Sequence, residues 1–132
     1  MKKISVIVVS FNVKPYVEQC ILSLRKALRE IDSEVIVVDN CSTDGTAGYI
    51  SSRYPDVKVL RNHVNCGFSK ANNQAIRVSD SEYVLLLNPD TLVSEDAISG
   101  CLAFMDRQKD AGAVGLKMLQ VDGVKAPESR RG

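Results

Sequence analysis

Asn88, Pro89 and Asp90 directly follow a short apolar run, Tyr83 to Leu87, that is typical of a buried strand. Carboxylate and amide oxygens suit Mg²⁺ and Mn²⁺, and Mg²⁺ usually takes one or two carboxylates and shares its remaining positions with substrate phosphates. Proline fixes the local φ and holds the loop out of the sheet. A plain Pro-Asp turn explains the same three residues, because such turns are common. On its own, the tripeptide leaves both interpretations open.

Asp39 ends another apolar run and begins the polar segment "DNCSTDG". A carboxylate at a strand end can accept hydrogen bonds from a base or a ribose, which is how open α/β sheets recognise nucleotides. Ser42, Thr43 and Asp44 are better explained as capping residues of the next helix. Asp39 precedes that loop and is poorly placed to cap the helix. We therefore expect Asp39 to bind a ligand.

The segment "NCGFSKANN", residues 65 to 73, combines a glycine with two adjacent amides. Gly67 would let the backbone approach a ligand closely, and Asn72 and Asn73 are unusual in mid-helix because amides compete for backbone hydrogen bonds. A glycine turn leading into a helix with polar outward faces accounts for the segment equally well. The sequence contains neither G-x-G-x-x-G nor a Walker motif, which excludes a dinucleotide fingerprint and a P-loop.

Apolar runs alternate with helical patterns along the chain, which predicts an α/β fold with a parallel sheet and right-handed crossovers. The expected strands are residues 4–11, 34–39, 57–60, 83–87 and 113–119, and the expected helices are residues 16–31, 42–54, 69–78 and 95–107. A hairpin turn is expected at residues 121–124. Ligands bind at the carboxyl ends of such strands. Polar residues follow four of the strands: Ser10 and Asn12, Asp39 and Asn40, Arg61 and Asn62, Asn88 and Asp90.

The composition is that of one ordinary globular domain of 132 residues, in which residues 120–132 are expected to form a hairpin or a flexible tail. A net charge of +1 gives no nucleic-acid footprint, so we expect no nucleic-acid partner. The four scattered cysteines indicate free thiols in a reducing, cytoplasmic compartment. The apolar run after Lys3 is too short for a signal peptide or a bilayer span. His63, the only histidine, is expected to have a surface or packing role.

Four segments in order, "ISVIVVSFN", "EVIVVDNCSTDGT", "NCGFSKANNQAI" and "YVLLLNPDTLV", resemble the inverting nucleotide-sugar glycosyltransferases of family 2. The resemblance runs from about Ile4 to Leu119. The chain is most similar to the subset that transfers deoxyhexoses such as rhamnose onto cell-surface polysaccharides, where N-P-D is usual at this strand end. The resemblance implies the GT-A fold, a Rossmann-like and mostly parallel sheet with helices on both faces, here truncated at the C-terminus.

The same resemblance implies roles for individual residues. Asp39 would accept a hydrogen bond from the pyrimidine base, and Asp90 would coordinate the divalent cation, Mg²⁺ or Mn²⁺, that bridges the donor diphosphate. Asn88 stands where the family's D-x-D motif has its first acid, so it offers the cation an uncharged ligand or serves as a hydrogen-bond donor. The other residues implied to lie beside the nucleotide are Ser10, Asn12, Gly67, Lys70, Asn72 and Asn73.

The implied reaction is a single displacement that inverts the anomeric carbon of a UDP- or dTDP-linked sugar, with a saccharide or a lipid-linked acceptor. Family members are commonly at least twice this length, so the catalytic base and the acceptor site are expected beyond residue 132. The missing part could bring the protein to the inner face of the membrane, and its absence predicts apolar surface and self-association. A non-catalytic module that binds a nucleotide-sugar or a partner is the alternative. A sugar nucleotidyltransferase is less favoured, because "SFNVKPY" lacks glycine.

Overall fold

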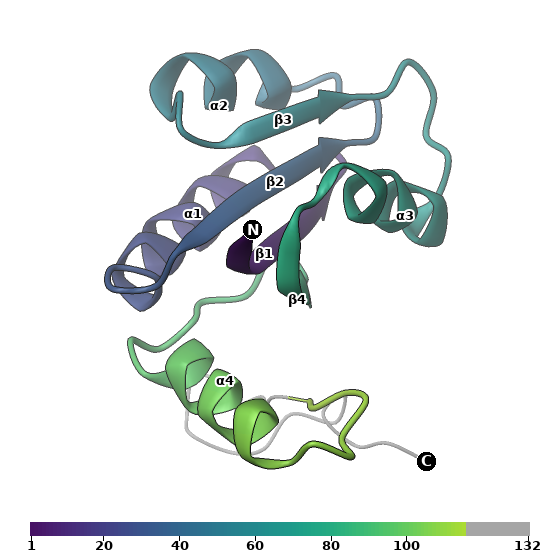
Figure 1. Ribbon diagram of the computed structural model, residues 1–132. Helices are drawn as coiled ribbons and strands as arrows, with labels where there is room; N and C mark the ends of the chain where they lie inside the picture. Colours follow the sequence, from purple (N-terminus) through teal and green to yellow (C-terminus); the bar gives the residue numbers. More distant parts are fainter. Residues whose placement is uncertain (116–132) are drawn as a thin grey trace, which may run out of the picture.

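The computed structural model of the protein describes residues 1–115, in which strands and helices alternate along the chain (Figure 1). The strands are β1 (Lys2–Ser10), β2 (Ser33–Asp39), β3 (Lys58–Arg61) and β4 (Ser81–Leu87). The helices are α1 (Lys14–Ala27), α2 (Thr46–Arg53), α3 (Phe68–Val78) and α4 (Ala97–Arg107). The expected α/β alternation is confirmed for these eight elements.

The four strands form one parallel sheet in the order β3-β2-β1-β4. Its register brings the strand ends level, because Ser10 of β1 pairs with Asp39 of β2, and Asp39 pairs with Arg61 of β3. Every strand therefore delivers the polar residues that follow it to the same edge of the sheet. This is the edge at which open α/β sheets bind ligands.

Both faces of the sheet are covered. Successive side chains along β1 and β2 point to opposite faces, and the apolar residues on both faces must be buried. Val6, Val8 and Val37 point to the face that packs against α1 and α2, where Ile21, Leu24 and Ile50 are buried. The next residues in each strand point the other way and pack against α3; this second cluster consists of Ile7, Val9, Ile36, Val38, Ala71 and Ala75. Figure 1 shows α3 on the opposite side of the sheet from α1 and α2.

Helix α4 packs on the α1 side, beyond the loop that follows β4 (Figure 1). Ile98 and Leu102 join the larger apolar cluster. Asp106 anchors the end of the helix, because its carboxylate lies 3.0 Å from Lys3 Nζ and accepts a hydrogen bond of 2.9 Å from the Tyr83 hydroxyl. The helix is therefore held at the amino-terminal end of β1 and β4, away from the ligand-binding edge.

Several element ends differ from the sequence-based expectation. The first helix ends at Ala27 because the chain turns at Leu28 and brings Ile31 against the apolar cluster before β2 begins. Residues 113–115 of the strand expected at 113–119 are not in a strand, and the remainder of that strand, the turn at 121–124 and the tail at 120–132 lie outside the described residues. Within residues 1–115, no helix is long and apolar enough to cross a membrane.

Candidate functional site

A groove of about 280 Å³ opens at the carboxyl ends of β2 and β3, beside the start of α2. It is lined by polar residues at both strand ends, by Gly45 in the loop before α2 and by Ala47 in α2. The lining residues are Asp39, Cys41, Ser42, Gly45, Ala47, Arg61, Asn62 and His63. A groove of this size between two strand ends can hold a planar base.

Asp39 is the most constrained group of the groove, with 3% of its surface exposed. Ser10 Oγ donates to its Oδ1 at 3.1 Å, the Ser42 hydroxyl donates to the same oxygen, and the Ser42 backbone N–H donates to Oδ2 at 3.1 Å. An ionised carboxylate has about four acceptor positions, so one remains for a ligand donor. The protein thus orients Asp39 without exhausting its capacity to accept.

The loop after β1 and the loop after β2 are tied together through Asn12. Its backbone N–H donates to Ser42 Oγ at 2.9 Å, and its side-chain Oδ1 accepts from the Thr43 N–H at 2.8 Å. Asn12 and Cys41 both have positive φ, 54° and 69°, a conformation that costs a residue with a Cβ some strain. The expectation that Ser42 and Thr43 cap α2 is wrong, because their polar groups serve Asp39 and Asn12 instead.

Asp44 accepts hydrogen bonds at the start of α2, as expected, and also at the start of α1. Its Oδ1 accepts from the Thr46 N–H at 3.1 Å and from the Thr46 hydroxyl, and its Oδ2 accepts from the Lys14 N–H at 3.1 Å. Burial acts to raise the pKa of Asp44, but the hydrogen bonds from Thr46 and Lys14 outweigh it and hold that pKa below its usual value. One ionised carboxylate therefore joins two helix starts beside the groove.

A network of side-chain amides holds Asn62, one of the residues that line the groove. Asn62 Nδ2 donates to Asn40 Oδ1 at 2.9 Å, and Asn62 exchanges two hydrogen bonds with Gln74 of α3, at 2.8 and 2.9 Å. Asn40 Nδ2 in turn donates to the Gly67 carbonyl at 3.1 Å. The network fixes the ends of β2 and β3 to the start of α3. Sequence reasoning noted Asn40 and Asn62 as strand-end residues but missed this role.

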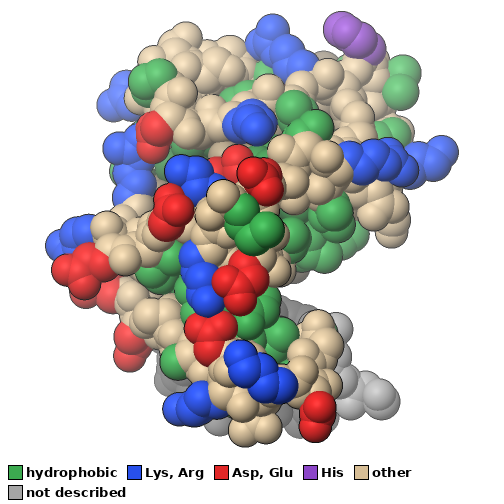
Figure 2. All heavy atoms as spheres, in the orientation of Figure 1, with side chains coloured by type: hydrophobic (Ala, Val, Ile, Leu, Met, Phe, Trp, Pro, Cys, Tyr) green, Lys and Arg blue, Asp and Glu red, His purple; other side chains and the backbone are tan. Residues whose placement is uncertain are grey.

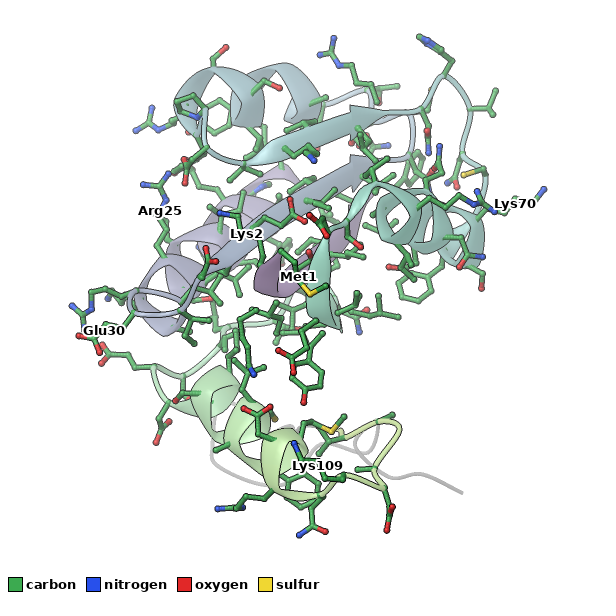
Figure 3. All side chains as sticks on the ribbon, viewed as in Figure 1. Met1, Lys2, Arg25, Glu30, Lys70 and Lys109 are labelled. Carbon is green, nitrogen blue, oxygen red and sulfur yellow. The ribbon has the colours of Figure 1, made fainter. Side chains whose placement is uncertain are left out.

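The residues predicted on α3 and before it do not line the groove. Gly67 precedes the helix with a φ of 85°, which explains the need for glycine there. Asn72 is buried, and its Nδ2 donates to the Phe68 carbonyl at 3.1 Å. Lys70 and Asn73 are exposed, and Figure 3 shows Lys70 extending away from the sheet. The structure therefore leaves their predicted contact with a nucleotide as a prediction.

Asn88 and Asp90 lie in the turn after β4, which the Thr91 N–H closes by donating to the Asn88 carbonyl at 3.2 Å. Both side chains are exposed, and neither forms a hydrogen bond within the described residues. Burial raises the pKa of Cys20 in α1 to about 12, and the negative charge of Asp90 adds to that effect. Within residues 1–115, no three metal-ligating side chains of His, Cys, Asp or Glu gather at one point.

Sequence reasoning noted Arg61 as a strand-end residue without giving it a role, and it missed His63 as a groove residue. Arg61 is the last residue of β3 and His63 lies two residues beyond it; that position was the available signal, although His63 was expected only in a surface or packing role. The groove thus combines the carboxylate of Asp39 with the guanidinium of Arg61. Figure 2 shows acidic and basic side chains mixed over the visible face of the molecule.

Comparison with solved structures identifies the fold as that of the GT-A glycosyltransferases. The crystal structure of Staphylococcus aureus TarS in complex with UDP-GlcNAc superimposes with a TM-score of 0.72 at 27% identity, over 89% of this chain and 38% of that one. The mannosyltransferase PcManGT from Pyrobaculum calidifontis, in complex with GDP-Man and Mn²⁺, gives a TM-score of 0.73 at 24% identity, over 89% of this chain and 36% of that one. The latter likeness shows the fold alone.

The family model for glycosyl transferase family 2 matches residues 5–128, and the chain therefore belongs to that family. It is 32% identical to the poly(ribitol-phosphate) beta-N-acetylglucosaminyltransferase TarS of S. aureus, over 98% of this chain and 23% of TarS. It is 31% identical to the N-acetylglucosaminyl-diphospho-decaprenol L-rhamnosyltransferase of Mycobacterium tuberculosis, over 96% of this chain and 44% of that enzyme. The chain thus spans less than half the length of these relatives.

Proposed function

We propose that this chain binds the nucleoside diphosphate part of a sugar donor along the carboxyl edge of its sheet. The order of groups along that edge supports the proposal: Arg61 and Asp39 stand at the groove, Ser10 follows, and Asp90 lies beyond β4. Neighbouring strands are about 4.8 Å apart, so the edge from β3 to β4 spans about 14 Å. That length accommodates a base in the groove and a diphosphate near Asp90.

In this proposal Asp90, assisted by Asn88, holds Mg²⁺ or Mn²⁺ together with the donor diphosphate. The exposed, unbonded oxygens of these two residues fit such a cation, since Mg²⁺ commonly takes one or two carboxylates and completes its shell with phosphate oxygens and water. When bound, the cation would neutralise charge on the leaving nucleoside diphosphate. A site with one carboxylate and one amide offers the free cation little affinity, so metal and nucleotide should bind together.

The proposed reaction of the whole protein is transfer of the sugar with inversion at its anomeric carbon. Such a displacement needs a carboxylate that deprotonates the acceptor hydroxyl. Asp44 accepts hydrogen bonds from two helix starts, and Asp106 accepts them from Lys3 and Tyr83. Asp39 lies in the groove proposed for the nucleotide's base. We therefore propose that the catalytic carboxylate, which deprotonates the acceptor, comes from outside residues 1–115. The 132-residue chain alone would then bind the donor but transfer little sugar.

The donor, acceptor and location are also proposals. Because TarS has been solved with UDP-GlcNAc, a UDP-sugar is the first donor to test, with a dTDP-sugar as the second. The names of the two relatives point to a cell-wall polymer or a lipid-linked saccharide as acceptor. A cytoplasmic protein working at the inner face of the membrane would meet both a soluble donor and a lipid-linked acceptor.

The groove around Asp39 carries this proposal, and amide chemical shifts test it without any mutation. UDP added with Mg²⁺, which is diamagnetic, to the ¹⁵N-labelled chain should shift the backbone amides of Asp39, Ser42 and Asn62, which line the groove. Amides of α4, which is packed at the other end of the sheet, should serve as an internal control and stay unchanged. Shifts confined to α4, or no shifts at saturating UDP, would contradict the proposal.

A further inference from the structure

Arg61 and Asp39 form the last aligned pair of β3 and β2. Partners in a parallel register point to the same face of the sheet, so both side chains extend toward α2. Ser10 occupies the same position on β1 and completes a row across three strands. In the part of the chain that the structure describes, Arg61 and Asp39 form no ion pair, although both line the groove.

Gly48 explains where the Arg61 guanidinium goes instead. A Cβ built on Gly48 would stand 3.2 Å from Arg61 Nη2, so the guanidinium lies over the bare backbone of α2. Gly48 is not at a helix end and needs no positive φ, and glycine at such a position weakens a helix. The space it leaves is occupied by the guanidinium. Gly48 thus lowers the stability of α2 but leaves space for the Arg61 guanidinium beside the groove.

The two groups present a specific pair of hydrogen-bonding roles. An ionised carboxylate such as Asp39 only accepts, and a guanidinium only donates. When the ring nitrogen of a base faces Asp39 and its neighbouring exocyclic group faces Arg61, the edge that fits both carries a ring N–H next to a carbonyl oxygen. Uracil, thymine and guanine carry that lactam edge, whereas cytosine and adenine present an unprotonated ring nitrogen beside an amino group. In that orientation cytosine or adenine would present the wrong group to both partners, and the largest cost in affinity arises at the buried Asp39, which would face an unprotonated nitrogen in place of a donor.

We propose that Arg61 determines base specificity by donating to the exocyclic carbonyl oxygen of a lactam base whose ring N–H is accepted by Asp39. This inference rests on the proposed function and adds to it the residue that selects the nucleotide. Gly48 supports Arg61 by leaving the guanidinium its position over α2. Arg61 acts at the base and makes no contribution to holding the diphosphate.

The test is calorimetric titration of UDP and of CDP, each with Mn²⁺, into the 132-residue chain and its Arg61→Met variant. Hydrogen bonds to charged groups change affinity by about 10- to 100-fold, so the wild-type chain should bind UDP tighter than CDP by a factor in that range. Arg61→Met should weaken UDP binding by about tenfold or more and leave CDP binding nearly unchanged. Arg29→Met, which removes another exposed arginine, located just after α1, is the matched control and should change neither affinity.

Gly48→Ala provides a second variant that retains Arg61 and displaces its guanidinium by a few tenths of an ångström. It should reduce the preference for UDP over CDP while α2 remains folded by circular dichroism. Equal loss of UDP and CDP affinity in Arg61→Met would overturn the inference, because it would place Arg61 on the diphosphate. An unchanged preference would overturn it as well. If the wild-type chain binds neither nucleotide, the proposed function itself is wrong and this inference falls with it.

Discussion

Asp44 accepts a hydrogen bond from the backbone N–H of Lys14, a residue thirty positions earlier in the chain, at 3.1 Å. The same carboxylate accepts from Thr46, so the first turns of α1 and α2 share one acceptor. Two helix starts normally leave several backbone donors without partners. Here a single residue fixes the loop before α1 relative to the loop before α2, and the second of these loops lines the groove.

The first prediction follows from this shared acceptor. Asp44→Ala removes the partner of donors in two helices and should lower the free energy of unfolding by about 1–2 kcal/mol, the usual cost of losing a helix-capping side chain. It should also weaken UDP binding, because the loop containing Ser42 loses its support. Urea denaturation measures the first effect and calorimetry the second. Asp44→Asn, which keeps one acceptor oxygen, should recover part of both, and a variant as stable as wild type would contradict the role.

The second prediction concerns acid stability. The hydroxyls of Tyr54 and Tyr49 donate to Glu18 Oε2 at 2.7 and 2.8 Å, and these hydrogen bonds hold the pKa of Glu18 below its usual value. The hydrogen bonds from Lys3 and Tyr83 lower the pKa of Asp106 in the same way. A carboxylate with a lowered pKa in the folded state stabilises the fold above its unfolded pKa of about 4, and this stabilisation is lost as the pH falls through the folded pKa.

The urea concentration at the midpoint of unfolding should therefore decrease as the pH is lowered from about 6 to about 3, because these carboxylates become protonated over that range. Glu18→Gln should lower the midpoint at pH 6 and make the decrease toward pH 3 smaller, since one of the titrating groups is gone. Glu30→Gln, on an exposed residue after α1, is the matched control and should follow the wild-type curve. Parallel curves for Glu18→Gln and wild type would show that Glu18 contributes nothing to acid stability.

The third prediction tests the amide network. Asn62 and Gln74 exchange two hydrogen bonds, so removing either side chain leaves the other without its partner. Each alanine substitution should cost about 1–3 kcal/mol of unfolding free energy. A double-mutant cycle should show a coupling of about 0.5–3 kcal/mol, and strictly additive costs would contradict the coupling. Asn73→Ala, on the exposed side of the same helix, should change stability by less than about 0.5 kcal/mol.

The fourth prediction concerns self-association of the 132-residue chain. β4 is the last strand of the sheet on its side within the described residues, and Val84 and Leu86 on it are 40% and 48% exposed. An open strand edge with apolar side chains favours pairing with a second copy. Light scattering at high concentration should show dimers, and Leu86→Lys should shift them to monomers. Leu22→Lys, at a 47% exposed position of α1, should leave the dimers intact. A monomeric wild-type chain would contradict the prediction.

The strands and helices were predictable because they depend on local patterns. The β-branched run in β1 and the three- and four-residue spacing in α1 each indicate one type of element. Asp39 was predictable as a site residue because it ends a buried strand, and the structure places it in the groove. The segment "EVIVVDNCSTDGT", which contains Asp39, is also one of the four segments that resemble the family in order.

The hydrogen-bonding partners could not be predicted in the same way. Ser42 and Thr43 look like caps in the sequence, but their partners include Asn12, thirty residues away, and such a contact exists only once β1 and β2 are paired. The place of Arg61 depends on Gly48, whose missing side chain reads only as a weak point in a helix. These hydrogen bonds and contacts form between loops that follow different strands, so local sequence patterns cannot predict them.

The most direct measurement is calorimetric titration of UDP, then dTDP, into the 132-residue chain with and without Mn²⁺, repeated on Asp90→Ala. We predict that wild type binds the nucleotide tighter with Mn²⁺, and that Asp90→Ala removes this metal dependence while its melting temperature stays close to wild type. Asn88→Asp, which supplies a second carboxylate, should strengthen it. Metal-dependent binding that survives in Asp90→Ala would contradict the assignment of the metal site, and no nucleotide binding to wild type would contradict the donor site itself.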